Sequence, residues 1–338
     1  MMKTYLKRAL AMLLAIAMLF IGGIVAFART PAQARNDVLA YLTANVTVPT
    51  VSAVGGEWAV LALARGGANV PVGYYDDYIN RVRQILNNNN GVLPGPVTEH
   101  ARVVIALSAL GIDVTNIDGR NLLMPLANFD NVTAQGINGA AFALVALDTR
   151  GWAIPAIANS AAQTTRQRLV EFILSREISG GGFALGAATT PGADVTAMVL
   201  QSLVPYRSQA AVAAVIDRAL AVLPQLPVQT AESAAQVVIA LSSWGLSSEN
   251  ALNTLLALQR LNGSFVHAAS GAGNHQMATE QAALALVAHQ RAVSGQHILF
   301  DMQDVPARAL PQQTMSVFQL LLQVIQWIVG VITWLIVR

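Results

Sequence analysis

Short stretches that are apolar on almost every side recur between residues 37 and 292, at intervals of roughly 40 to 55 residues. Alanine and leucine dominate these stretches, and both residues favour helix. A helix that is apolar all round is buried in protein or in lipid, and these stretches are too short to cross a membrane. We therefore predict six helices buried within folded protein, at residues 57–63, 99–110, 139–147, 194–203, 232–244 and 279–288.

Amphipathic stretches lie between the apolar ones, and each has one charged or polar side. They comprise residues 36–44, 75–86, 164–177, 208–223 and 248–260. Repeats of this length indicate one supersecondary unit per period. Buried helices that alternate with half-exposed helices predict an all-α fold of two concentric rings. This is an (α/α)6 toroid of about six helical hairpins, whose inner helices surround a central pocket.

Glycine follows most of the apolar stretches, at Gly66, Gly111, Gly151 and Gly245. A glycine just past a helix supplies the left-handed conformation that closes it. We therefore expect each of these four residues to end a buried helix.

The two ends of the chain differ from the middle. Residues 1–28 are basic and then apolar, and they close with a small-x-small pattern, which is typical of a signal peptide. An uncleaved anchor is the alternative. Residues 316–338 contain an uncharged run long enough to span a membrane, although an amphipathic helix on a surface would also fit. The predicted organisation is a linker at 29–36, the toroid at 37–292 and a linker at 293–315, all outside the cytoplasm and anchored to the cell membrane.

Composition removes several classes of function. Charged residues make up 11% of the chain and the net charge is +2, without basic clusters in the folded part, so we expect no nucleic-acid partner. The chain has no cysteine, so it has neither disulfides nor thiolate metal sites. We expect no cofactor.

A second repeat supports the toroid. The segments EISGGGF at 177–183, QRLNGSF at 259–265 and NNNNGVL at 87–93 each follow an amphipathic stretch. They resemble the repeat of squalene and terpenoid cyclases and of protein prenyltransferases. The chain looks most like bacterial surface proteins that carry prenyltransferase and squalene-oxidase repeats. The resemblance covers residues 37–292 and implies the α/α toroid, a fold shared by enzymes, cobalamin carriers and complement-type proteins.

Acidic residues begin five of the six buried stretches, and an amide takes the sixth place. If the inner helices are parallel, these side chains ring one mouth of the pocket, although carboxylates at helix starts also cap helices and complement their dipoles. With two neighbouring residues, the predicted pocket set is Glu57, Trp58, Glu99, Asn138, Asp194, Glu232, Glu280 and Gln281.

Asp194 is the candidate catalytic residue. The segment GADVTA at 192–197 resembles the acid motif of the cyclases, in which the central aspartate donates a proton. Gly192 and Val195 replace the two flanking acids, and a protonating acid needs such neighbours. Prenyl transfer is disfavoured because the family's zinc site uses a cysteine.

His267 and His275 are weak candidates for metal ligands, together with Glu280. Their spacing matches no common metal site, and an exposed loop with scattered histidines is the alternative reading. Some cobalamin carriers of this fold offer a loop histidine to a corrinoid. Here a second chain would have to close over it, because no β domain fits after Arg291.

The sequence thus favours a non-catalytic binding or interaction module over an enzyme. Its pocket would take an apolar or amphiphilic small molecule, or a segment of a partner protein. The alternatives are a cyclase-type enzyme that uses Asp194, a corrinoid-capturing module, and a display scaffold. A binding module of this kind needs an open pocket, whereas a scaffold has bulky side chains that fill the ring.

Overall fold

The computed structural model describes residues 29–273 and 275–312, together with residues 325, 327–329 and 333. None of these residues belongs to a β-strand, and only isolated bridges occur between them. The prediction of an all-α fold is therefore confirmed for the part of the chain that the structure describes.

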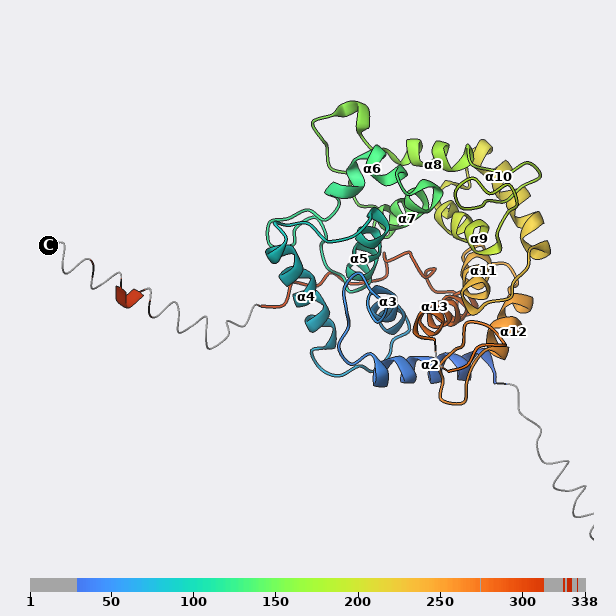
Figure 1. The fold of residues 1–338 in the computed structure, drawn as a ribbon, viewed down its shortest axis with the longest axis horizontal. Coiled ribbons are helices and arrows are strands. Elements are labelled where there is room, and N and C mark those ends of the chain that lie inside the picture. Colours follow the sequence, from blue (N-terminus) through green and yellow to red (C-terminus); the bar gives the residue numbers. More distant parts are fainter. Residues whose placement is uncertain (1–28, 274, 313–324, 326, 330–332, 334–338) are drawn as a thin grey trace, which may run out of the picture.

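Six helices, which we call the inner helices, coincide with the predicted apolar stretches. Each packs against the next along the chain, and the last packs against the first, so their contacts form a closed circuit (Figure 1). Most of their residues are buried because neighbours cover them on several sides. The inner helices are α3 (Glu57–Arg65), α5 (Val97–Ala109), α7 (Gly136–Asp148), α9 (Ala193–Ser202), α11 (Ala231–Ser243) and α13 (Gln276–Val293).

The five amphipathic stretches form helices outside this circuit (Figure 1). These are α2 (Pro31–Asn45), α4 (Tyr74–Asn88), α8 (Arg166–Leu174), α10 (Ala210–Val222) and α12 (Glu249–Ala257). A further short helix, α6 (Phe129–Thr133), was not among the predicted stretches. Short 3-10 turns supplement them: η1 (Met124–Ala127), η2 (Ser160–Ala162), η3 (Val204–Tyr206) and η4 (Leu223–Gln225). Helix α2 packs against α3, α12 and α13, so the beginning of the folded chain lies against its end.

Helix α2 begins at Pro31, within the segment expected to be a linker. Thr30 explains this early start, because it forms a capping box with Gln33. The Thr30 side chain accepts a hydrogen bond from the Gln33 N–H, and Gln33 Oε1 accepts one from the Thr30 N–H. Two free N–H groups at the helix start are thereby satisfied.

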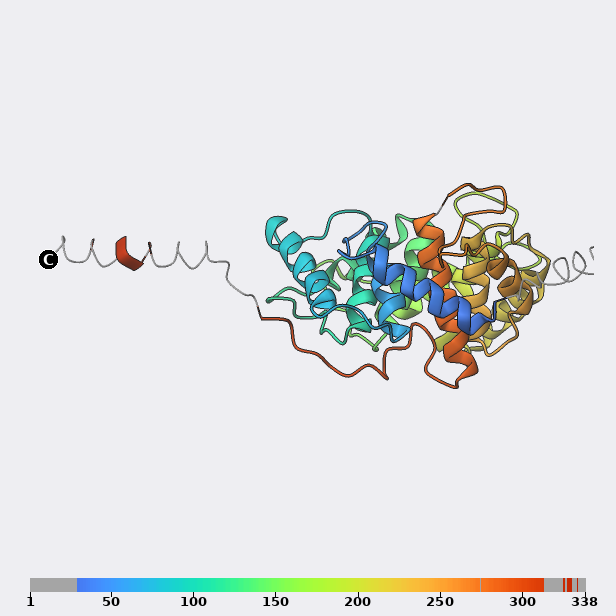
Figure 2. The ribbon, with the colours of Figure 1, turned by 90° about the horizontal axis from the view of Figure 1, so that it is seen from below.

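The inner helices are parallel, so the molecule has an N-terminal face, where they begin, and a C-terminal face, where they end. Residues 296–312, which we call the strap, cross the C-terminal face (Figure 2). They contact the ends of three inner helices: Arg65 of α3 donates to Ile298 O, Met302 N–H donates to Thr149 O, and Arg308 N–H donates to Gly111 O. The strap lies within the region expected to be a linker, yet Met302 is fully buried in it.

Three of the four expected glycines end their helices with a positive φ, namely Gly111, Gly151 and Gly245. Gly66 does not, because its φ is −81° and the left-handed residue is Gly67, with a φ of 65°. A side chain at Gly66 would meet the Ala62 carbonyl oxygen at 2.7 Å. Close packing at the end of α3 therefore requires glycine at position 66.

The glycine-rich repeat forms the same local structure twice. The Phe183 N–H donates to the Thr196 hydroxyl, and the Phe265 N–H donates to the Thr279 hydroxyl, each at 2.9 Å. Both phenylalanines are fully buried. Each copy of the repeat therefore docks the loop before an inner helix onto a threonine of that helix.

The predicted signal peptide at 1–28 and most of the predicted anchor at 316–338 lie outside the described residues. A search of the described residues finds no helix that is both long and apolar enough to cross a membrane.

Candidate functional site

The acidic residues at the helix starts do not form one uniform ring, because they occupy different positions in their first turns. Glu57 is the first residue of α3 and Asp194 the second of α9, whereas Glu280 is the fifth of α13. Since successive residues of a helix point about 100° apart, these carboxylates point in different directions. The structure separates them into a buried pair, two surface clusters and an exposed residue.

Glu57 and Glu280 form the buried pair, with exposed fractions of 1% and 2%. Both hold the loop of residues 46–56 that leads into α3. Glu57 Oε1 accepts hydrogen bonds from the Ser52 N–H at 2.8 Å and the Tyr78 hydroxyl at 3.2 Å. Glu280 Oε1 accepts from the Gly55 N–H at 2.6 Å. The first and last inner helices therefore clamp the same loop.

Burial raises the pKa of both carboxyl groups above its usual value of 4.5. Hydrogen bonds to backbone and side-chain donors oppose this effect, as does the positive charge of Arg102. The charge of Glu57 also raises the pKa of Glu280, which shows that the two groups interact.

Several polar atoms around this pair are buried and have no hydrogen-bond partner. They are Ser52 Oγ, Tyr74 Oη and Arg102 Nε. The charge of Glu280 contributes to the raised pKa of Tyr74, and that of Arg102 lowers the pKa of Glu57, so these residues surround the carboxylates. Because an unsatisfied buried polar atom costs free energy, such a concentration indicates a site for a bound group or water.

Trp58, Glu99 and Arg102 form the first surface cluster. Arg102 makes an ion pair with Glu99, one turn earlier on α5, and its guanidinium lies 5.7 Å from the centre of the Trp58 ring. Trp58 also lies 5.9 Å from Phe142 of α7. Since α3 and α7 are separated by α5 in the circuit, the two rings meet across its interior.

Gln281 belongs to a chain of amides on the other side of the circuit. Gln201 of α9 donates to Gln236 of α11 at 2.9 Å, and Gln236 donates to Gln281 of α13 at 3.3 Å. Trp58 and Gln281, which we expected to line a central pocket, thus contact Phe142 and Gln236 respectively.

Glu232, and not Glu280, is the carboxylate that meets the two histidines. Its oxygens lie 2.8 Å from His267 Nδ1 and 3.4 Å from His275 Nδ1. His275 Nδ1 also accepts a hydrogen bond from the Ala278 N–H and so caps α13. Within residues 29–273 and 275–312, no group of three or more histidine or acidic residues is arranged to hold a metal ion.

Asp194 is exposed, and its carboxylate makes no hydrogen bond or ion pair with the described residues. The N-cap of α9 is Gly192, so Asp194 does not cap the helix with its side chain. Asn138 is half-buried in the first turn of α7 and does not cap that helix either. Neither residue lies in a cluster with the other acids.

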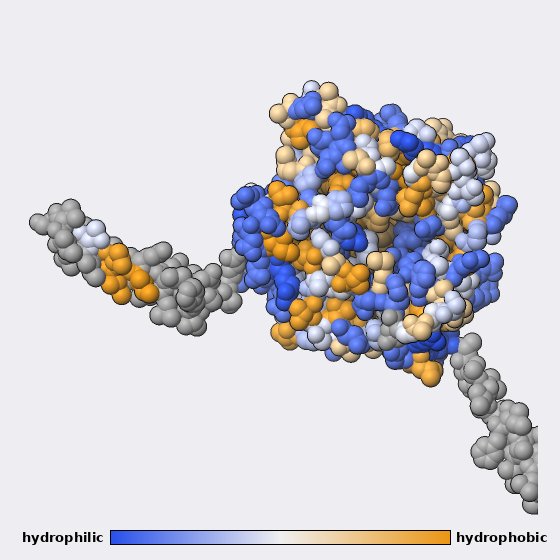
Figure 3. Space-filling view, viewed as in Figure 1, coloured by the Kyte–Doolittle hydropathy of each residue, from blue (hydrophilic) through white to orange (hydrophobic). Residues whose placement is uncertain are grey.

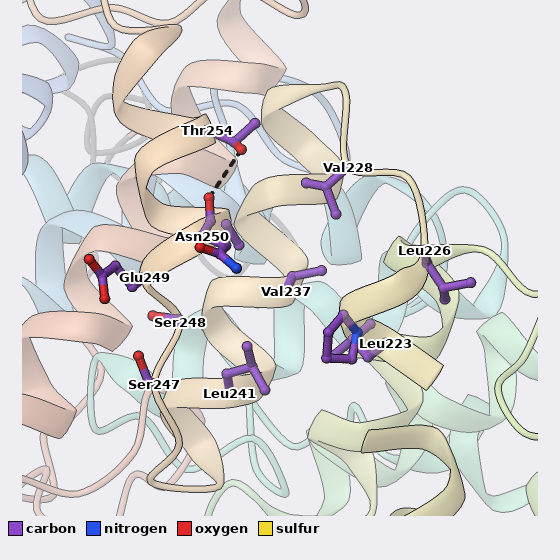
Figure 4. A pocket seen from close by; sticks show the side chains of 12 residues that line it. Leu223, Leu226, Val228, Val237, Leu241, Ser247, Ser248, Glu249, Asn250 and Thr254 are labelled. Carbon is purple, nitrogen blue, oxygen red and sulfur yellow. Dashed lines mark hydrogen bonds between the residues drawn. The ribbon is translucent and has the colours of Figure 1, made fainter. Parts of the chain in front are cut away.

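Two further cavities lie away from these residues. One, of about 430 Å³, lies between η4, α11 and α12, with an apolar floor that includes Val237 and Leu241 and a polar edge that includes Glu249 (Figure 4). The other, of about 380 Å³, lies between the strap and the ends of α7 and α9. The sequence patterns indicated neither cavity. The first is lined by residues between Leu223 and Thr254, whereas the second combines three segments that are distant in sequence.

Sequence reasoning also missed Ser52 and Tyr74. Their positions in a loop and at the start of an outer helix carried no signal, and only the fold brings them to the inner helices. No protein-family model matches the chain, and neither does any curated protein or any solved structure.

Proposed function

We propose that this chain is a non-catalytic, extracytoplasmic binding module that recognises a segment of a partner protein on its N-terminal face. We also propose that the helical circuit is an (α/α)6 toroid of the cyclase and prenyltransferase type. The closed contacts of the inner helices and the repeated glycine-rich loops support this architecture.

The observation that carries the proposal is the concentration of unsatisfied buried polar atoms behind the N-terminal face. Ser52 Oγ, Tyr74 Oη and Arg102 Nε account for three of the five such side-chain atoms found in the described part of the chain. Each buried polar atom without a hydrogen-bond partner needs an explanation in a native structure, and we propose that binding of a partner segment at the 46–56 loop rearranges the loop and completes these contacts. The remaining two atoms belong to Thr164 and Gln259, in other parts of the fold.

The loops of the same face present large apolar side chains to solvent. They are Val48, Val54, Val92, Leu185 and Leu261, and Met277 joins them at the start of α13. Figure 3 shows this face, where apolar and polar residues are interleaved. Apolar contacts around polar anchors are typical of protein interfaces, so the composition of the face suits a protein partner.

A small apolar ligand inside the circuit is less well supported than a partner on the surface. Trp58 and Phe142 meet across the interior, and the glutamine chain occupies the opposite side. These contacts inside the circuit also suit a display scaffold, which differs from a binding module in having no specific partner.

The cyclase alternative receives no support from the geometry. A proton donor for an alkene needs a closed cavity and neighbouring groups that stabilise its conjugate base. Asp194 is exposed and has no such neighbour in the described residues. Corrinoid capture would need His267 or His275 to leave Glu232, and it would need a second chain.

The membrane attachment stays part of the proposal. The strap ends beside α4, where Arg83 donates to Pro311 O, and the predicted anchor follows. An anchor at 316–338 would attach on the side of the C-terminal face, leaving the N-terminal face free to meet a partner. Protease treatment of intact cells should then remove residues 29–315 and leave a membrane-bound C-terminal fragment. Recovery of the whole chain in the cytoplasm would contradict this part.

Site-specific photo-crosslinking tests the recognition face. A benzoylphenylalanine replaces Val54 on the N-terminal face, and Leu246 on the C-terminal face is the control, because the exposed fractions of these residues are similar at 44% and 47%. We expect one discrete crosslinked species from position 54 in intact cells and none from position 246. No crosslink from position 54, or the same species from both positions, would contradict recognition by the N-terminal face.

A further inference from the structure

The cavity between the strap and the ends of α7 and α9 lies on the C-terminal face and has fixed walls. Its volume of about 380 Å³ falls within the range of about 300 to 1,000 Å³ that small-molecule sites occupy. Arg65 donates hydrogen bonds to Ile298 O at 3.0 Å and to Asp301 O at 2.7 Å. The Met302 N–H donates to Thr149 O at 2.8 Å. These contacts hold the strap in place, so the cavity is formed before any ligand binds.

Two carboxylates line this cavity, and the described residues that line it include no lysine, arginine or histidine. Asp148 accepts hydrogen bonds from Arg166 Nε and from the Tyr206 hydroxyl, each at 2.6 Å. Asp301 Oδ2 lies 2.7 Å from His297 Nδ1. Arg166 balances the charge of Asp148, so one negative charge remains at Asp301 when the His297 ring is neutral. The charge of the cavity therefore favours a cation.

Two buried polar side chains of the cavity wall also have only acceptors to offer a ligand. Gln201 is 8% exposed, and its Nε2 donates to Gln236 O at 3.1 Å and to Gln236 Oε1 at 2.9 Å. Both amide hydrogens are thus used, while Gln201 Oε1 accepts no hydrogen bond from the described residues. The Ser202 hydroxyl donates to Val199 O at 2.8 Å. Because a buried acceptor without a donor costs free energy, this wall is suited to a ligand that donates hydrogen bonds.

The rest of the cavity wall is mainly apolar. Val145 of α7, Val204 and Pro205 of η3, and Ile298 and Phe300 of the strap line it. A ligand that fills the cavity therefore buries an apolar body against these side chains, in addition to meeting the acceptors. Ligand sites commonly combine an apolar lining with a few polar groups that fix the orientation of the ligand.

We propose that this cavity binds a small primary amine with a short apolar body. An ammonium group has three donors and no acceptor, and so it complements the oxygens of Asp148, Asp301 and Gln201 that line one cavity. Amino acids and phosphate esters of amines fit less well, because no cationic side chain lines the cavity to balance their anionic groups. The site is separate from the recognition of a protein segment, which we place on the opposite face.

The experiment measures binding by calorimetry with the full-length chain in detergent, and each titration is repeated into detergent alone. The probes share a phenylbutyl body and differ in the polar group: phenylbutylamine, phenylbutanol and phenylbutyrate. We expect one amine to bind per chain. The alcohol should bind at least about tenfold more weakly, because hydrogen bonds between charged groups are stronger than neutral ones. The carboxylate should show no measurable binding, because the charge of the cavity repels it.

Asp301→Asn is the most informative variant, because it removes a charge and keeps the shape of the side chain. The amine affinity should fall at least about tenfold, while the alcohol affinity stays the same. Val204→Phe adds a ring to the cavity wall and should weaken the binding of both probes. Asp217→Asn is the matched control, since Asp217 is exposed on α10 and does not line the cavity. It should leave both affinities unchanged.

Failure of the parent chain to bind phenylbutylamine would overturn the proposal. An alcohol that binds as tightly as the amine would show apolar partitioning without recognition of the ammonium group, and it would overturn the proposal equally. An amine affinity that is unchanged in Asp301→Asn would place the ligand elsewhere. Melting temperatures show whether the variants fold, and should Val204→Phe fail to fold, the Asp301→Asn comparison still decides. The outcome is separate from photo-crosslinking at position 54, which reports a partner on the other face.

Discussion

Arg65 of α3 lies 2.6 Å from Asp304 of the strap, and this ion pair fastens the strap to the end of an inner helix. Arg291 of α13 binds the other oxygen of the same carboxylate. Asp304 therefore separates two arginines whose side chains are largely buried at the C-terminal face. Its pKa is lowered in consequence: the hydrogen bonds and charges of the arginines outweigh the effect of burial, which alone would raise it.

Asp304→Ala should destabilise the protein markedly. The change leaves two buried arginines beside each other without their carboxylate, and loss of one partner of a buried pair costs about 3 kcal/mol or more. Urea unfolding of the full-length chain measures the effect. Arg308→Ala is the control, because it breaks an exposed strap pair with Asp76, which should cost at most about 1 kcal/mol. Equal losses in the two variants would show that the Arg65–Asp304–Arg291 group has no special role.

Gly111→Ala should loosen the strap. Gly111 has a φ of 77°, and an added Cβ would lie 2.1 Å from the Pro306 carbonyl oxygen. Gly151→Ala is a matched control, since Gly151 has a φ of 66° and open space around the added atom. Backbone strain should lower the free energy of unfolding of the control by about 1 kcal/mol. Gly111→Ala should lower it distinctly more. Limited proteolysis should cleave the strap faster in Gly111→Ala only, and equal cleavage of the two variants would contradict the expectation.

The buried pair should make stability depend on pH. Because the folded-state pKa values of Glu57 and Glu280 lie above 4.5, the folded protein binds more protons than the unfolded chain just above that pH. Stability contributed by these groups is therefore complete below pH 4.5 and is lost as pH rises through their raised pKa values.

The double variant Glu57→Gln, Glu280→Gln tests this dependence. Denaturant unfolding from pH 4 upward, without divalent ions, should show a smaller loss of stability with rising pH in the variant than in the parent. Burial also raises the pKa of Asp148, but Asp148 is present in both proteins. The difference between the two pH profiles therefore reports Glu57 and Glu280 alone. Parallel pH profiles would show that the pair does not titrate as expected.

Asp194 should contribute little to stability or to catalysis. Its carboxylate makes no cap hydrogen bond. Asp194→Ala should therefore lower the free energy of unfolding by only about 0.5 kcal/mol, from the lost interaction with the dipole of α9. Thr230→Ala is the comparison, because the Thr230 hydroxyl caps α11 by accepting from the Ser233 N–H, a bond worth about 1 kcal/mol. The parent chain should form no cyclic product from squalene. A cyclic product that disappears in Asp194→Asn at unchanged melting temperature would make the protein an enzyme.

The sequence determined which segments are helical and which of them are buried. The apolar stretches at 57–63 and 232–244, for example, lie on α3 and α11, because helix formation and burial depend on local periodicity. The glycine-rich segments at 177–183 and 259–265 were also recognisable as a repeat, although the hydrogen bonds of Phe183 to Thr196 and of Phe265 to Thr279 were seen only in the structure. The predicted signal peptide and anchor stay predictions.

Only the tertiary structure decided which side chains meet. Acidic residues at helix starts looked equivalent along the chain, but the rotation of each helix buries Glu57, pairs Glu232 with two histidines and leaves Asp194 in solvent. A shift of one residue turns a side chain by about 100°, which no apolar pattern resolves. Likewise, the apolar residues of the strap follow no helical period, and its place follows from Arg65 and Arg291, whose donors it satisfies.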